Sequence, residues 1–142
     1  MKRLARMTVP CLTMLALQFA AVATTIPDRM NLELVGLSTL NDAGKGGEGL
    51  ALKQYGSRKI LFLAHESGPQ CFSVVDVTST TDPVVLKQIP VEAEFVRCNS
   101  LGLSGNILVV ARQTEKVGQP YGGIKIYDVT EANNPNCFHP WI

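Results

Sequence analysis

The sequence predicts an all-β protein of about two four-stranded antiparallel units, preceded by an N-terminal signal helix. A β-rich run that ends in Asp-Val-Thr and continues to a proline occurs twice, at 73–83 and 124–135. The offset between the runs is constant, since 52 residues separate Asp76 from Asp128 and Pro83 from Pro135. No stretch of the mature chain shows a convincing helical period with caps. A fixed period of this length is typical of a repeat architecture.

Each unit is expected to contain four short strands. The first copy is predicted at 49–52, 59–64, 70–77 and 83–91, and the second at 100–103, 107–111 and 123–129, with a fourth strand from Phe138. The second strand of each copy is nearly continuous in apolar residues, so we expect both of its faces to be covered by neighbouring units. Four antiparallel strands repeated about every 45 to 52 residues indicate blades of a β-propeller.

The predicted ring of blades is incomplete. A closed propeller takes about 4 to 8 blades, whereas this chain holds two, with residues 32–40 as a candidate for part of another. The predicted domains are a signal peptide at 1–23, a leader with one strand and a glycine-rich loop at 24–48, a first repeat at 49–98 and an incomplete second repeat at 99–142. Two blades leave strand edges and apolar faces uncovered, which favours a fragment of a longer protein.

The aspartate and the proline of each repeated run are expected to shape turns. Asp76 and Asp128 follow a strand, where a carboxylate can accept backbone hydrogen bonds from the turn ahead. Pro83 and Pro135 set the backbone φ angle at the entry to the outer strand. We interpret these four residues as structural, and the two aspartates as turn formers rather than catalytic acids.

The two runs, together with the apolar strand at 107–111, resemble the LVIVD repeat family. That resemblance covers about residues 49 to 137. Members of the family are mainly exported or cell-surface proteins of bacteria and archaea, and their repeats are understood as four-stranded units of a propeller. The resemblance implies a repeat protein of this kind and no catalytic residues.

The N-terminus predicts export. A basic segment at 1–6 precedes a largely apolar stretch at 7–20, and Ala21-Val22-Ala23 is a small-x-small cleavage site. The apolar run is interrupted by Pro10 and is shorter than the roughly 20 residues that span a bilayer, so we expect no stable membrane span after cleavage. The expected location is periplasmic, secreted or cell surface. A net charge of +1 without a basic cluster beyond the N-terminus argues against nucleic acid as a partner.

The candidate site lies where the predicted blades meet. In a blade, the turn between the second and third strands and the link to the next blade lie on the same face. This placement brings Cys71 near Cys98, which we predict to form a disulfide, and leaves Cys137 as the odd thiol. The other residues of this candidate site are the candidate binding residues His65, Glu66, Arg97 and Arg112.

Catalytic, metal and cofactor sites are not predicted. There is no Gly-x-Ser-x-Gly nucleophile motif and no Cys-x-x-Cys pair. His65 and Glu66 are an acid/base or metal candidate, but adjacent residues on a strand point to opposite faces unless the strand has ended. The glycines 44, 46 and 49 match a dinucleotide fingerprint, yet a strand follows them where that motif needs a helix, so a hairpin loop is favoured.

Three functions remain open from the sequence. The first is an exported module that binds a protein, a glycan or a small molecule through its loop face. The second is part of a propeller enzyme, lactonase-like or a metal-dependent oxidase, whose active site needs further blades. The third is a truncated product without independent activity.

Overall fold

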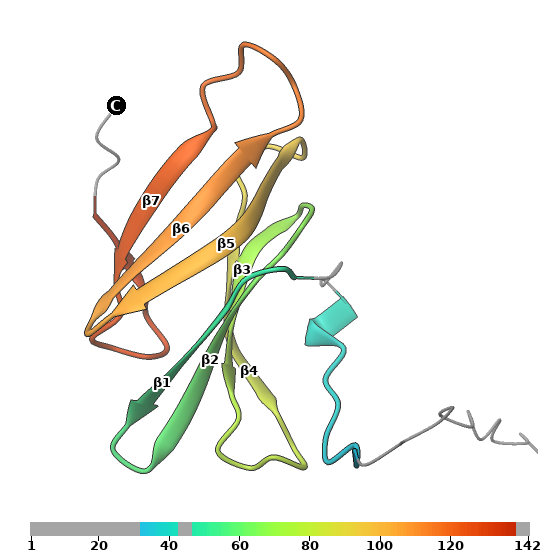
Figure 1. Ribbon diagram of the computed structural model, residues 1–142, viewed down its shortest axis with the longest axis vertical. Coiled ribbons are helices and arrows are strands. Elements are labelled where there is room, and N and C mark those ends of the chain that lie inside the picture. Colours follow the sequence, from blue (N-terminus) through green and yellow to red (C-terminus); the bar gives the residue numbers. More distant parts are fainter. Residues whose placement is uncertain (1–31, 43–46, 139–142) are drawn as a thin grey trace, which may run out of the picture. The chain divides into compact units, whose positions relative to one another are not determined.

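The computed structural model describes residues 32–42 and 47–138, which form eight strands and one short 3-10 helix (Figure 1). The predicted signal peptide, the start of the leader and the fingerprint glycines 44 and 46 lie outside the described residues. The elements are η1 (Leu40–Asp42), β1 (Leu50–Tyr55), β2 (Arg58–Ala64), β3 (Gln70–Asp76), β4 (Val84–Pro90), β5 (Val96–Ser104), β6 (Ile107–Thr114), β7 (Gly123–Asp128) and β8 (Asn136–Cys137).

The strands form two antiparallel sheets, ordered β1-β2-β3-β4 and β5-β6-β7-β8. We call them the first and the second sheet. Both begin with a two-residue hairpin whose glycine, Gly56 or Gly105, has a φ of +60° or +56°. Glycine adopts this left-handed conformation without the steric cost of a Cβ atom. The all-β prediction is confirmed, and the described residues form two sheets rather than a closed ring.

Three predicted elements differ from the structure. Residues 32–40, where the leader was predicted to hold one strand, form none; the segment instead passes Thr80 so closely that a Cβ atom on Gly36 would lie 2.0 Å from the Thr80 carbonyl oxygen. The fourth strand of the second sheet begins at Asn136, two residues before the predicted start. The strand predicted at 49–52 continues to Tyr55, which pairs with Arg58 across a two-residue turn.

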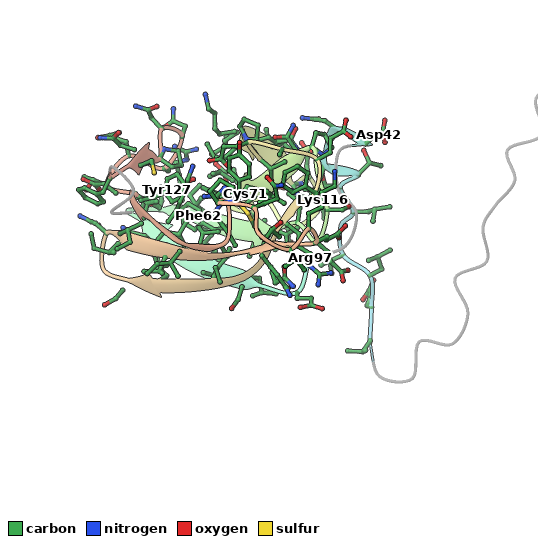
Figure 2. The ribbon with its side chains drawn as sticks, turned by 90° about the horizontal axis from the view of Figure 1, so that it is seen from above. Asp42, Phe62, Cys71, Arg97, Lys116 and Tyr127 are labelled. Carbon is green, nitrogen blue, oxygen red and sulfur yellow. A yellow bond between two sulfur atoms is a disulfide. The ribbon has the colours of Figure 1, made fainter. Side chains whose placement is uncertain are left out.

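One apolar core joins the two sheets. Each sheet contributes what we call its inner face, and Figure 2 shows Phe62 and Tyr127 among the side chains between the strands. Phe72 of the first sheet meets the Tyr127 ring of the second at a centroid distance of 5.1 Å and an interplanar angle of 78°, an edge-to-face contact. The inner face of the first sheet comprises Ile60, Phe62, Ala64, Phe72 and Val74, and that of the second comprises Leu101, Leu103, Leu108, Val110 and Tyr127.

The opposite faces of the sheets, their outer faces, are only partly covered. The expectation that both faces of the central strands are buried is therefore wrong. In β2, Ile60 and Phe62 are fully buried, whereas Leu61 and Leu63, which alternate with them along the strand, are half-buried. In β6, Leu108 is buried, but the side chain of Ile107 is 39% exposed. The cause is that each sheet packs on one other sheet within the described residues.

The two aspartates lie in matching turns. The Asp76 carboxylate accepts a hydrogen bond from the Thr78 amide at 2.9 Å, and the Asp128 carboxylate accepts one from the Thr130 amide at 2.8 Å. Hydrogen bonds from these threonines lower the pKa of both carboxyl groups. Pro83 directly precedes β4 and Pro135 directly precedes β8. Each aspartate thus accepts a backbone hydrogen bond from the residue two positions later, and each proline stands one residue before the outer strand.

Candidate binding site

The site begins where β2 ends and the second sheet starts. The His65 amide donates to the Cys71 carbonyl at 2.9 Å, and the His65 carbonyl accepts from the Cys98 amide at 3.0 Å. These bonds hold the β2–β3 loop against the first residues of β5. Cys71 and Cys98 form the predicted disulfide between β3 and β5, with Cα atoms 5.1 Å apart, and Cys137 is a free thiol. The disulfide is compatible with an oxidising, exported location.

Four polar side chains line this junction, and we call them the polar cluster: Glu66, Arg97, Asn99 and Gln113. The Arg97 guanidinium lies 3.9 Å from the Glu66 carboxylate. Arg97 Nε donates to Gln113 Oε1 at 3.2 Å, and Asn99 Nδ2 donates to the same oxygen at 3.3 Å. Figure 2 labels Arg97 at the margin of the sheets. The cluster therefore joins the β2–β3 loop to β5 and β6.

The hydrogen bonds fix which way the amides of the cluster point. A guanidinium only donates, so Gln113 must turn its carbonyl oxygen toward Arg97. Asn99 must then donate its NH₂ group to that oxygen, which leaves Asn99 Oδ1 as a buried acceptor without a partner. Ser67 Oγ and Gln70 Oε1 in the neighbouring loop and strand are also buried and unpartnered among the described residues. A buried polar atom of this kind costs about 1–3 kcal/mol unless something hydrogen-bonds to it.

His65 lies beside the cluster but does not face solvent. Its side chain is 0% exposed, and its Nε2 lies 2.7 Å from the hydroxyl of Ser73, which is also fully buried. Gln88 Nε2 donates to the same hydroxyl and to the Leu40 carbonyl. Although this is the distance of a nucleophile and its base, a buried serine is closed to substrate. The network instead links the β2–β3 loop, β3 and β4 to η1.

His65 and Glu66 do not converge, although β2 ends before them at Ala64. The imidazole turns inward while the Glu66 side chain is exposed. Burial lowers the pKa of His65, because a charged imidazolium loses its hydration inside the protein. The ring is therefore neutral near pH 7 and serves as a hydrogen-bonding element of the fold.

The lowered pKa of His65 predicts a pH-dependent stability. Below about pH 6.5 the unfolded chain binds a proton at this histidine, whereas in the folded chain the imidazole stays neutral to a lower pH. The free energy of unfolding therefore has its full value above about pH 6.5 and decreases as the pH drops below it. We expect a lower midpoint of denaturant unfolding at about pH 5 than at about pH 8. His65→Gln should remove this difference, and an unchanged pH dependence in that variant would contradict the assignment.

Arg112 does not join the polar cluster. It sits opposite Cys98 in the β5–β6 ladder, and its side chain, 8% exposed, pairs with Glu92 from the connection between the sheets. Lys125 of β7 pairs with the same carboxylate. Burial opposes ionisation of Glu92, but the hydrogen bond from Lys125, a backbone bond and the Arg112 charge together keep its pKa below the usual range.

Glu92 and Lys125 were not predicted from the sequence. Lys125 stands between Ile124 and Ile126 in a strand. Successive side chains of a strand point to opposite faces, so the lysine lies on the face of the sheet opposite the two isoleucines. That face is the inner face, where a charge needs a partner. The partner could not be found, because Glu92 is distant in sequence and lies in an irregular connection.

Within residues 32–42 and 47–138, no group of three or more His, Cys, Asp or Glu side chains is arranged to hold a metal ion. No helix of the described part of the chain is long and apolar enough to cross a membrane. No protein-family model matches the sequence, and no curated protein matches it either. The resemblance to LVIVD repeats therefore remains a prediction.

Proposed function

We propose that the chain supplies blades of an exported repeat protein of the propeller type, which binds a hydroxyl-rich ligand such as a glycan without catalysing a reaction. The observation that carries the binding role is the solvent-accessible pair Arg97 and Glu66 of the polar cluster, whose side chains are 28% and 48% exposed. A guanidinium donates hydrogen bonds and a carboxylate accepts them, so this pair can bind the oxygens and the O–H groups of a hydroxyl-rich ligand.

The propeller assignment is supported by the arrangement of the strands. Each sheet is a four-stranded antiparallel meander, and the outer strand of the first, β4, leads directly to the first strand of the second, β5. That order is the one expected of consecutive blades. Matching Asp-Thr turns end the third strand of both sheets. The N-terminal sequence and the disulfide support export.

The geometry of the polar cluster suits recognition of hydroxyl groups. Arg97 and Glu66 supply a fixed donor and a fixed acceptor 3.9 Å apart, and Gln113 holds Arg97 and Asn99 in place. A few polar groups in a rigid setting give orientation and specificity to a noncovalent site. The disulfide adds rigidity, because Cys98 lies next to both Arg97 and Asn99 in β5.

The proposal predicts glycan binding that depends on the polar cluster. On an array of immobilised oligosaccharides, the wild-type chain should bind a subset of glycans. Arg97→Ala and Asn99→Ala should weaken that binding by about tenfold each, since a hydrogen bond lost from a desolvated site costs about 1–2 kcal/mol.

Lys116→Ala is the matched control, because Lys116 is an exposed cation in the β6–β7 loop outside the cluster. It should bind glycans as the wild type does. Failure of the oxidised wild-type chain to bind any glycan on the array, or equal binding by all variants, would count against the proposed function.

A further inference from the structure

The outer face of the second sheet is an apolar surface that lacks cover among the described residues. Ile124 of β7 is 63% exposed, Ile107 of β6 is exposed as well, and their neighbours on the same face are half-buried. Contiguous exposed apolar side chains on a sheet mark a contact surface more often than isolated ones do. The five side chains of this outer face are Ile107, Val109, Ala111, Ile124 and Ile126.

These five residues correspond in sequence to the inner face of the first sheet. Forty-seven residues separate Ile60 from Ile107, and 52 separate Phe72 from Ile124. In the first sheet, every one of the corresponding side chains is 0% exposed, because the second sheet covers them. The second sheet thus carries a copy of a surface that, in the first sheet, binds a neighbouring sheet.

The complementary surface is exposed on the same chain. The second sheet covers its neighbour with Leu101 and Leu103 of β5, and the residues 51 positions earlier are Leu50 and Leu52 of β1. Their side chains are 65% and 57% exposed. Leu61 and Leu63 of β2 lie on the same outer face and are half-buried. The chain therefore presents both halves of its own inter-sheet contact, one on each outer face.

We propose that a second copy of this chain docks the outer face of its second sheet on the outer face of the first sheet, head to tail. The contact would reproduce the packing already present between the two sheets. It would use β1 and β2 of the receiving copy, because η1 already lies against β4 of the first sheet, where the Leu40 carbonyl accepts a hydrogen bond from Gln88 Nε2. Such a contact is heterologous, so repetition either closes a ring or extends a filament.

The number of copies in a closed ring follows from the proposed propeller type, on which this inference rests. A ring of about four to eight blades needs about two to four chains of two sheets each. Ring closure would leave no outer face exposed, which removes the apolar surface of every copy from water.

Sedimentation velocity of the purified, oxidised chain and of three variants tests the proposal. Ile124→Glu places a charge on the outer face of the second sheet, and Leu50→Glu places one on the outer face of the first. Val117→Glu is the control, since Val117 is a fully exposed apolar residue in the β6–β7 loop and lies on neither sheet. We expect the wild type and the Val117→Glu variant to associate, and the other two variants to sediment as monomers.

Mixing the two monomeric variants distinguishes head-to-tail docking from a symmetric contact. The Ile124→Glu chain keeps an intact first-sheet face, and the Leu50→Glu chain keeps an intact second-sheet face, so a mixture should form dimers and nothing larger. A monomeric wild type, a Leu50→Glu variant that associates like the wild type, or a mixture that stays monomeric would each overturn the proposal. Glycan binding by the polar cluster is measured separately on the Ile124→Glu and Leu50→Glu variants. If the docking proposal is wrong and the proposed function is right, both variants should still bind glycans.

Discussion

Phe72→Ala should lower the free energy of unfolding by about 3–5 kcal/mol, the range for removal of a buried phenylalanine. The Phe72 side chain is 0% exposed and lies in the core between the two sheets. Its loss leaves a cavity against Tyr127 and removes the edge-to-face contact between the rings. Denaturant unfolding of the oxidised chain, with the slope of the transition checked against the wild type, measures the change.

Ile124→Ala is the matched control for this variant. Ile124 occupies the position of the second sheet that corresponds to Phe72, 52 residues later, but its side chain is 63% exposed. We expect a loss of less than about 1 kcal/mol, as for other surface substitutions. Equal destabilisation by Phe72→Ala and Ile124→Ala would mean that the inner face of the first sheet and the outer face of the second are equally covered, which would contradict the packing described above. The assay belongs at low protein concentration, where docking between copies contributes least.

Replacing the disulfide with the Cys71→Ser/Cys98→Ser pair should lower the free energy of unfolding by about 3–4 kcal/mol. The bond joins residues 27 positions apart, and the loop-entropy estimate for a loop of that length gives this value. The loss should be large because the bond also ties β3 of one sheet to β5 of the other. Denaturant unfolding again measures it, and reduction of the wild type should reproduce it.

Cys137→Ser is the control for the disulfide variant. Cys137 is a free thiol that packs at the edge of the core, so its replacement should cost less than about 1 kcal/mol. If Cys71, Cys98 and Cys137 all react with a thiol reagent in the native, unreduced chain, the disulfide does not form. Stability that is insensitive to reduction would show that the bond forms without constraining the unfolded chain.

The sheets could be predicted from the sequence because their signals are local. Apolar runs such as 60–63 and 107–110, bounded by Gly56 and Gly105, specify hairpins through the backbone preferences of a few adjacent residues. The aspartate turns are equally local, since Asp76 bonds to a residue two positions away. The strand predicted within the leader does not form, because a strand also needs a hydrogen-bonding partner, and alternation of residue type does not supply one.

The candidate site was only partly predictable for a related reason. The proximity of Glu66 to Arg97 follows from the order of strands, and so does the pairing of Cys71 with Cys98. The side-chain partners within the site depend on rotamers and on irregular backbone. Asn99 lies at a register shift in β5, and Arg112 turns away to Glu92 in the connection between the sheets. Neither feature has a sequence pattern of its own.

A double-mutant cycle between Phe72 and Tyr127 most directly tests the claim that the first sheet packs its inner face on the second. The two residues lie in different sheets, with ring centroids 5.1 Å apart. Unfolding of Phe72→Leu, Tyr127→Leu and the double variant should give a coupling energy of about 0.5–1.5 kcal/mol. Additive effects of the two substitutions, as found for residues that do not touch, would contradict the packing of the sheets.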